Sequence, residues 1–253
     1  MDVTPFLDLK IAPKVVFDSL PERKTRPRFM VPTPDGDYRA VTWGAFADMI
    51  RKAGSFLTSV GFSSGDRGAI FSTNHVEWLA AFLGIQAAGG VMVPVYPANT
   101  PDQAGYIAHH SEAKVFFVSA QLLPRVIEAW SSYATVTKIV CFDEGADVEK
   151  MVETLRAKGK TVPDASEVRS RLVAFQTAAA AGAEHDKAHP GDFERIMNAV
   201  SLDQVGLMLY TSGTTGNPKG VPLTHYNVGI NGRDWLSVNG VLIDDHPVDI
   251  LWL

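Results

Sequence analysis

The sequence predicts an α/β fold in which helices flank a mostly parallel β-sheet. Between residues 42 and 142, short apolar runs of strand length alternate with longer segments of helical periodicity. Capping residues and prolines stand where helical segments begin, and glycines stand close to where two of them end. Strands that alternate with helices favour right-handed β-α-β units, whose strands lie parallel in one sheet.

The alternating region begins with a helix that Thr42 caps and that ends just before Gly61. The apolar residues that recur in it at helical spacing are Trp43, Phe46, Ala47, Ile50, Leu57 and Val60. Strands are then expected over 68–72, 91–95, 114–119 and 137–142. The helices between them are expected over 76–88, from Pro101 with Thr100 as its cap, and over 121–133.

Residues 143–200 and the segment before residue 42 have weaker patterns. The first forty residues are expected to be irregular, with a solvated basic run at 23–28. A polar helical region after residue 142 precedes a second helix over 166–181, which should end at Gly182. Residues 183–191 are expected to form an exposed connection, because they are polar and weakly patterned.

A loop of small residues follows an apolar strand expected over 205–210. Its glycines, which can adopt φ > 0 and turn backbone N–H groups toward an anion, are Gly213, Gly216 and Gly220. Its hydroxyl donors are Thr211, Ser212, Thr214 and Thr215. Lys219 adds a positive charge, and Pro218 should keep the segment a loop until Thr224 caps a helix that runs to about residue 235. The pattern predicts a polyphosphate cradle.

Two other kinds of glycine-rich loop have a different spacing. A Walker loop has four residues between its last two glycines and a lysine directly after the last one. Here two residues separate Gly213 from Gly216, and two more precede Lys219. Ser212 lacks the glycine two positions before it that a hydrolase nucleophile elbow requires. The remaining alternative is an ordinary surface loop rich in glycine and threonine.

Composition argues against several classes of function. A net charge of −5 and a pI near 5.8 do not favour a nucleic-acid partner. The single cysteine, Cys141, excludes an internal disulfide framework and is expected to be a buried strand thiol. The N-terminus has no signal-peptide pattern, and glycines and prolines divide the uncharged stretch 78–101. We therefore expect a cytoplasmic protein, with peripheral contact between the basic run and an anionic membrane as the alternative.

The histidines do not have the spacing of a metal site. His109 and His110 are adjacent and so point in different directions on a helix, and His185 and His189 have no cysteines nearby. We therefore assign no metal ligand. His225 is expected to pack against its neighbours, with contact to a bound nucleotide or acyl group as the alternative.

Residues 208–221 resemble, almost residue for residue, the phosphate-loop signature of the adenylate-forming superfamily. This superfamily includes acyl-CoA synthetases, luciferases and the adenylation domains of peptide synthetases. Residues 41–43 and 86–95 are similar to two further signatures in the right order. Residues 96–100 and 110–118 are similar to long-chain fatty acyl-CoA synthetases in particular.

The resemblance implies part of the large N-terminal domain of an adenylate-forming enzyme. The implied activity is ATP-dependent activation of a fatty acid to an acyl-adenylate and then to acyl-CoA, with ATP, Mg²⁺ and CoA as co-substrates. The residues implied to bind the phosphates are Thr211, Ser212, Gly213, Thr214, Thr215, Gly216 and Lys219. No catalytic residue is assigned.

Residues 1–253 are expected to form an incomplete N-terminal domain, because the family's later signatures and small C-terminal domain have no counterpart in them. We predict that the isolated chain binds ATP weakly and does not catalyse adenylation. One alternative is a non-catalytic fragment, or a subunit that a second polypeptide completes. The other is an adenylating ligase for a different carboxylic acid.

Overall fold

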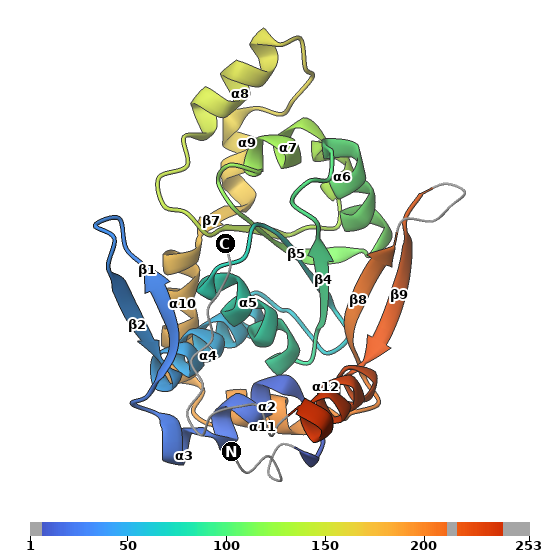
Figure 1. Cartoon of the computed structure of the whole chain (residues 1–253). Helices are drawn as coiled ribbons and strands as arrows, with labels where there is room; N and C mark the ends of the chain where they lie inside the picture. Colours follow the sequence, from blue (N-terminus) through green and yellow to red (C-terminus); the bar gives the residue numbers. More distant parts are fainter. Residues whose placement is uncertain (1–6, 212–216, 240–253) are drawn as a thin grey trace.

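A seven-stranded sheet lies at the centre of the computed structural model, which describes residues 7–211 and 217–239 (Figure 1). The strand order is β7-β6-β5-β3-β4-β8-β9; neighbours from β7 to β8 are parallel, and β9 is antiparallel to β8. The strands are β3 (Arg67–Phe71), β4 (Val91–Val95), β5 (Ala113–Val118), β6 (Lys138–Cys141), β7 (Leu172–Ala174), β8 (Val205–Thr211) and β9 (Lys219–Thr224). The predicted α/β class with a mostly parallel sheet is confirmed.

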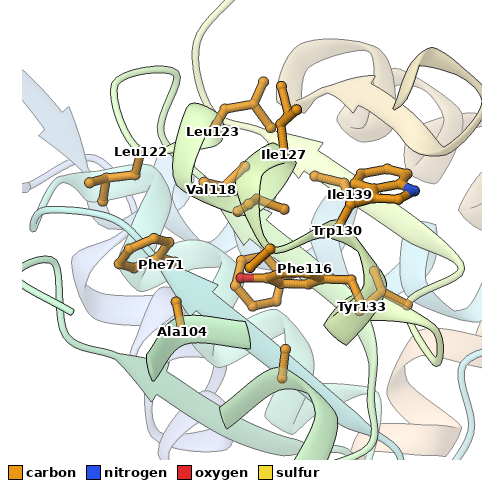
Figure 2. Close-up of a cluster of buried hydrophobic side chains, with 14 of the residues drawn as sticks. Phe71, Ala104, Phe116, Val118, Leu122, Leu123, Ile127, Trp130, Tyr133 and Ile139 are labelled. Atoms are coloured by element: carbon orange, nitrogen blue, oxygen red, sulfur yellow. The ribbon is translucent and has the colours of Figure 1, made fainter. Parts of the chain in front are cut away.

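One face of the sheet carries the largest apolar layer. Phe71 of β3 and Phe116 of β5 point into it, and Figure 2 shows them among the side chains of the covering helices. The ring of Tyr133 meets that of Phe116 edge to face, with centroids 5.0 Å apart. The elements that cover this face are α6 (Pro101–His110), α7 (Leu123–Glu128), the 3₁₀ turn η1 (Trp130–Tyr133), α8 (Val148–Ala157) and α9 (Ala165–Arg171).

The opposite face takes the alternate residues of the same strands. Ile70, Phe117 and Val140 pack there in a second layer of buried side chains. This alternation follows from the period of two in a β-strand, and buried parallel strands must be apolar on both faces. The helices on this side are α4 (Trp43–Ser59), α5 (Val76–Ala87) and α10 (Phe175–Ala188).

The predicted helix starts at Thr42 and Thr100 are confirmed. The side chain of Thr42 accepts a hydrogen bond from the backbone N–H of Ala45, 3.1 Å away. Thr100 and Gln103 satisfy each other's backbone N–H groups in a capping box at the start of α6. The glycine expected after the first helix, Gly61, has φ of +76°.

The expectation that the first forty residues are irregular is wrong. They contain α2 (Ala12–Asp18), α3 (Leu20–Arg23) and the antiparallel pair β1 (Pro27–Pro32) and β2 (Tyr38–Thr42). Apolar residues too sparse to show a period in the sequence are brought together by packing: Phe29 meets Phe46 of α4 with ring centroids 5.0 Å apart. Within the basic run, the guanidinium of Arg28 lies 4.8 Å from the centroid of the Trp43 ring.

The single helix expected over 166–181 is also wrong. α9 ends at Arg171, β7 follows as a strand paired with β6, and α10 continues past Gly182 through most of the expected connection. Gly182 lies inside α10 because that helix crosses α4 closely. A Cβ there would come 2.0 Å from the carbonyl oxygen of Lys52. A further helix, α11 (Asp192–Ala199), follows.

Two more expectations need correction. The helix expected over 121–133 is α7 followed by the separate turn η1. Residues 219–224, expected to lead as a loop into the next helix, instead form β9, and α12 (His225–Asn239) begins after it. In the described part of the chain, no helix is long and apolar enough to cross a membrane.

Candidate functional site

The predicted phosphate loop lies in the sequence between β8 and β9, which form a hairpin at the edge of the sheet (Figure 1). Thr211 and Lys219 are directly paired in the ladder, so the two ends of the loop face each other. Side chains of directly opposed residues lie on the same face, with Cβ atoms about 5 Å apart. Both side chains are exposed. The other predicted phosphate ligands, Ser212, Gly213, Thr214, Thr215 and Gly216, lie outside the described residues.

A cleft of about 450 Å³ opens beside this hairpin, at the carboxyl ends of β3, β4 and β8. Ligands of open α/β sheets bind outside the carboxyl ends of the strands. Leu209 lines the cleft, and Thr211 lies two residues further along β8 on the same face of the strand. The lining residues are Ser72, Thr73, Asn74, Trp78, Pro94, Val95, Tyr96, Pro97, Leu209 and Tyr210. The cleft therefore extends to the base of the predicted phosphate loop.

Polar contacts hold the first wall of the cleft, the segment after β3. The Ser72 hydroxyl, which is nearly buried, donates to the carbonyl oxygen of Thr73 and lies 3.0 Å from Nε2 of His75. His75 caps α5: its Nδ1 lies 3.2 Å from the backbone N of Trp78 and 3.2 Å from Oε2 of Glu77.

The hairpin is attached to α6 through Tyr210. The Tyr210 hydroxyl and Nδ1 of His110 are 2.8 Å apart, and the ring of Tyr106 stacks on that of His110. Burial raises the pKa of the Tyr210 phenol, so the phenol stays protonated at neutral pH. The neighbouring Met208 packs against the large apolar layer. These contacts fix the position of β8 just before the loop begins.

A second attachment lies at the far end of the hairpin. The ring of His225 is buried against Gly206, where a Cβ would come within 2.3 Å of the ring. Nε2 of Gln86 in α5 donates to the carbonyl oxygen of Gly206 at 3.0 Å. Because His225 follows Lys219 by the six-residue length of β9, roughly 20 Å of strand, this geometry agrees with a packing role for His225. Burial lowers its pKa.

The sequence indicated the two described ends of the loop but not the cleft beside it. Ser72, Asn74 and Trp78 come from a different part of the chain from Leu209, and only the strand order brings them together. The available signal was that small polar residues directly follow a buried strand. Among the described residues, no group of three or more His, Cys, Asp or Glu side chains could hold a metal ion.

Three comparisons with known proteins bear on this site. Residues 19–252 match the family model described as AMP-binding enzyme. The chain is 31% identical over 194 residues to long-chain-fatty-acid–CoA ligase FadD15 of Mycobacterium bovis, an alignment that covers 77% of this chain and 28% of that protein. It is 29% identical over 211 residues to 3-methylmercaptopropionyl-CoA ligase of Ruegeria pomeroyi, covering 80% of this chain and 34% of the relative.

Among solved structures, the chain resembles the anthranilate CoA ligase AuaEII in complex with anthranoyl-AMP. The TM-score is 0.62 at 20% identity, and the match covers 92% of this chain and 36% of that one. The shared feature is the fold. The chain therefore spans 28% to 36% of the length of these three proteins.

Proposed function

The chain belongs to the family of AMP-binding enzymes, and we propose that it supplies the phosphate-binding part of an ATP-dependent long-chain fatty-acid–CoA ligase. The observation that supports this most directly is the pairing of Thr211 with Lys219 at the tip of a hairpin beside the cleft. A hydroxyl and an ammonium group on one face suit the oxygens of a polyphosphate. The FadD15 relative supports the fatty-acid assignment.

In the proposed reaction, a carboxylate oxygen of the acid attacks the α-phosphorus of ATP. The bond from that phosphorus to the bridging oxygen breaks, and pyrophosphate leaves. The thiol of CoA then attacks the acyl carbon, so that AMP leaves and acyl-CoA forms. Thr211, Ser212, Gly213, Thr214, Thr215, Gly216 and Lys219 would bind the β- and γ-phosphates and stabilise the charge on the departing pyrophosphate. Mg²⁺ would enter with ATP, since phosphate oxygens and water supply most of its ligands in such sites.

We place the acid in the cleft. Trp78, Pro94, Val95 and Leu209 give it an apolar wall, and its volume of about 450 Å³ lies in the range of small-molecule sites. From there a carboxylate could approach the α-phosphate of a nucleotide held by the loop. An acid other than a fatty acid is the alternative, because a similar relative is a 3-methylmercaptopropionyl-CoA ligase. Titration of the chain with dodecanoate and with 3-methylmercaptopropionate separates these two possibilities. Only the preferred acid should saturate its binding site at low concentration.

The phosphate site is tested by calorimetric titration of the purified chain with ATP and Mg²⁺. Lys219→Ala should weaken binding by about 10- to 150-fold, which corresponds to the roughly 1.5–3 kcal/mol of a hydrogen bond to a charged group. Lys187→Ala is the matched control, because Lys187 is an exposed lysine in the last turn of α10, a helix that packs against α4 and does not line the cleft. Equal affinity for the wild type and Lys219→Ala would refute the phosphate role.

We further propose that residues 1–253 correspond to the N-terminal part of an adenylation domain, which additional polypeptide completes. The short span relative to FadD15 supports this. ATP–pyrophosphate exchange by the isolated chain should then be absent, and a rate near that of full-length relatives would refute it. A folded chain that binds no ATP would instead favour the non-catalytic fragment. The cytoplasmic location and the membrane contact of the basic run both stay predictions.

A further inference from the structure

His75 lies next to residues that form the first wall of the cleft and makes contacts through both ring nitrogens. Nε2 faces Ser72, and Nδ1 faces both the backbone N–H of Trp78 and the carboxylate of Glu77. The ring also meets Phe142 edge to face, with centroids 4.5 Å apart. One imidazole therefore connects the end of β3, the first turn of α5 and the residue after β6.

The two contacts of Nδ1 require opposite protonation. The Trp78 N–H needs a lone pair on Nδ1, whereas the Glu77 carboxylate needs a proton there. With the proton on Nε2, three hydrogen bonds run in one direction. Trp78 N–H donates to Nδ1, Nε2–H donates to the Ser72 oxygen, and the Ser72 hydroxyl donates to the Thr73 carbonyl. With the proton on Nδ1, the cap of α5 is lost. The Ser72 hydroxyl can then donate its single proton either to Nε2 or to the Thr73 carbonyl, but not to both.

The order Ser72, His75, Glu77 is also that of a nucleophilic triad, in which the carboxylate holds a proton on the near nitrogen and the far nitrogen accepts from serine. The remaining contacts oppose this arrangement. An imidazole that caps Trp78 through Nδ1 carries its proton on Nε2 and cannot accept one from Ser72. Ser72 is moreover only 3% exposed and already donates to the Thr73 carbonyl.

We propose that His75, protonated on Nε2, is a positioning residue that holds Ser72, Thr73 and Trp78 in the shape that binds the acid substrate. This inference rests on the proposed function, in which the acid occupies the cleft. His75 itself does not line the cleft. It acts through Ser72, whose oxygen it orients, and through Trp78, whose backbone it fixes at the start of α5.

The first test is the tautomer, measured from the ¹⁵N chemical shifts of the His75 ring in the full chain at neutral pH. Signals of a protonated Nε2 and an unprotonated Nδ1 are expected. A proton on Nδ1 would overturn the inference and favour the triad arrangement.

The second test is binding of dodecanoate, followed through the ¹⁹F signal of 5-fluorotryptophan at Trp78. His75→Ala should weaken binding by about fivefold, the scale of one lost hydrogen bond. His75→Asn should bind within about twofold of the wild type, because its amide oxygen can replace Nδ1 as the cap of α5. Thr42→Ala is the matched control: it removes the cap of α4, which does not line the cleft, and should leave dodecanoate affinity unchanged.

Two outcomes of the binding test would overturn the inference. If Thr42→Ala weakens dodecanoate binding as much as His75→Ala does, the effect is general loss of stability rather than positioning. If the wild type binds no dodecanoate although Nε2 carries the proton, the acid does not occupy the cleft. That second result removes the acid-positioning role together with that part of the proposed function, whereas a wrong tautomer removes the role of His75 alone.

Discussion

Gly206 offers a sharp test of how the hairpin that carries the phosphate loop is held. Gly206→Ala adds one methyl group, whose carbon would lie 2.3 Å from Cε1 and 2.6 Å from both nitrogens of the His225 ring. The ring cannot simply turn away into solvent, because His225 is only 5% exposed. The backbone of β8 cannot move freely either, since the carbonyl of Gly206 is bonded to Gln86. The substitution must therefore displace a buried ring or shift the strand.

The expected loss of stability follows from two opposing effects. Inserting a methyl group into a packed site costs about 1–3 kcal/mol. Replacing glycine by alanine restricts the unfolded chain and returns about 0.4–1 kcal/mol. With the middle of each range, the free energy of unfolding should fall by about 1–2 kcal/mol. For a protein of this size the melting temperature should fall by roughly 2–8 °C.

Urea unfolding followed by circular dichroism measures this change. Gly232→Ala in α12 is the matched control, because no atom lies within 4 Å of the added Cβ, and it should stabilise the helix by about 0.5–1 kcal/mol. In the double variant Gly206→Ala/His225→Ala the ring that the added methyl group would strike is absent. The loss of stability should therefore be smaller than the sum of the two single losses by about 1 kcal/mol or more. An unfolding midpoint for Gly206→Ala equal to that of the wild type would refute the reasoning.

The remaining predictions concern two buried titratable groups. Burial lowers the pKa of His225, so near pH 6 the folded chain binds fewer protons than the unfolded chain, and the free energy of unfolding should fall as the pH drops below about 6.5. Between pH 7.5 and pH 5.5 the free energy of unfolding should fall less for His225→Gln than for the wild type. An equal fall in both proteins would contradict this prediction. Burial also raises the pKa of the Cys141 thiol, so Ellman's reagent should react slowly with the native chain and fully in urea. Rapid native reaction would show that the thiol is accessible.

Sequence reasoning succeeded where local chemistry decides the structure. The strand expected over 91–95 has the bounds of β4, because its apolar residues directly follow two glycines and buried parallel strands are apolar on both faces. The start of α6 was predicted from Thr100 and Pro101, whose roles need only their nearest neighbours. The buried state of Cys141 followed from its place in such a run.

It failed where a distant segment decides the structure. Leu172–Ala174 lies within a helical pattern but forms β7, because the edge of β6 is available to pair with it. β9 contains Pro222, which disfavours a strand assignment from sequence and is tolerated at the edge of a sheet. Similarly, the loop was identified from one continuous motif, whereas the cleft needs residues from three strands and the His75 network needs their geometry.

The pairing of β9 has a consequence for the proposed phosphate site. β9 is hydrogen-bonded in the sheet only to β8, so among the described residues the ladder between these strands sets the position of Lys219. A slip of one residue would place Lys219 opposite a different residue and turn its side chain to the other face, away from Leu209 and the cleft. The attachments at Tyr210 and at Gly206 flank the segment where this register is set. Because a charge that binds a phosphate well must be in place before the ligand arrives, these two attachments should matter for ATP affinity although neither residue belongs to the predicted phosphate loop.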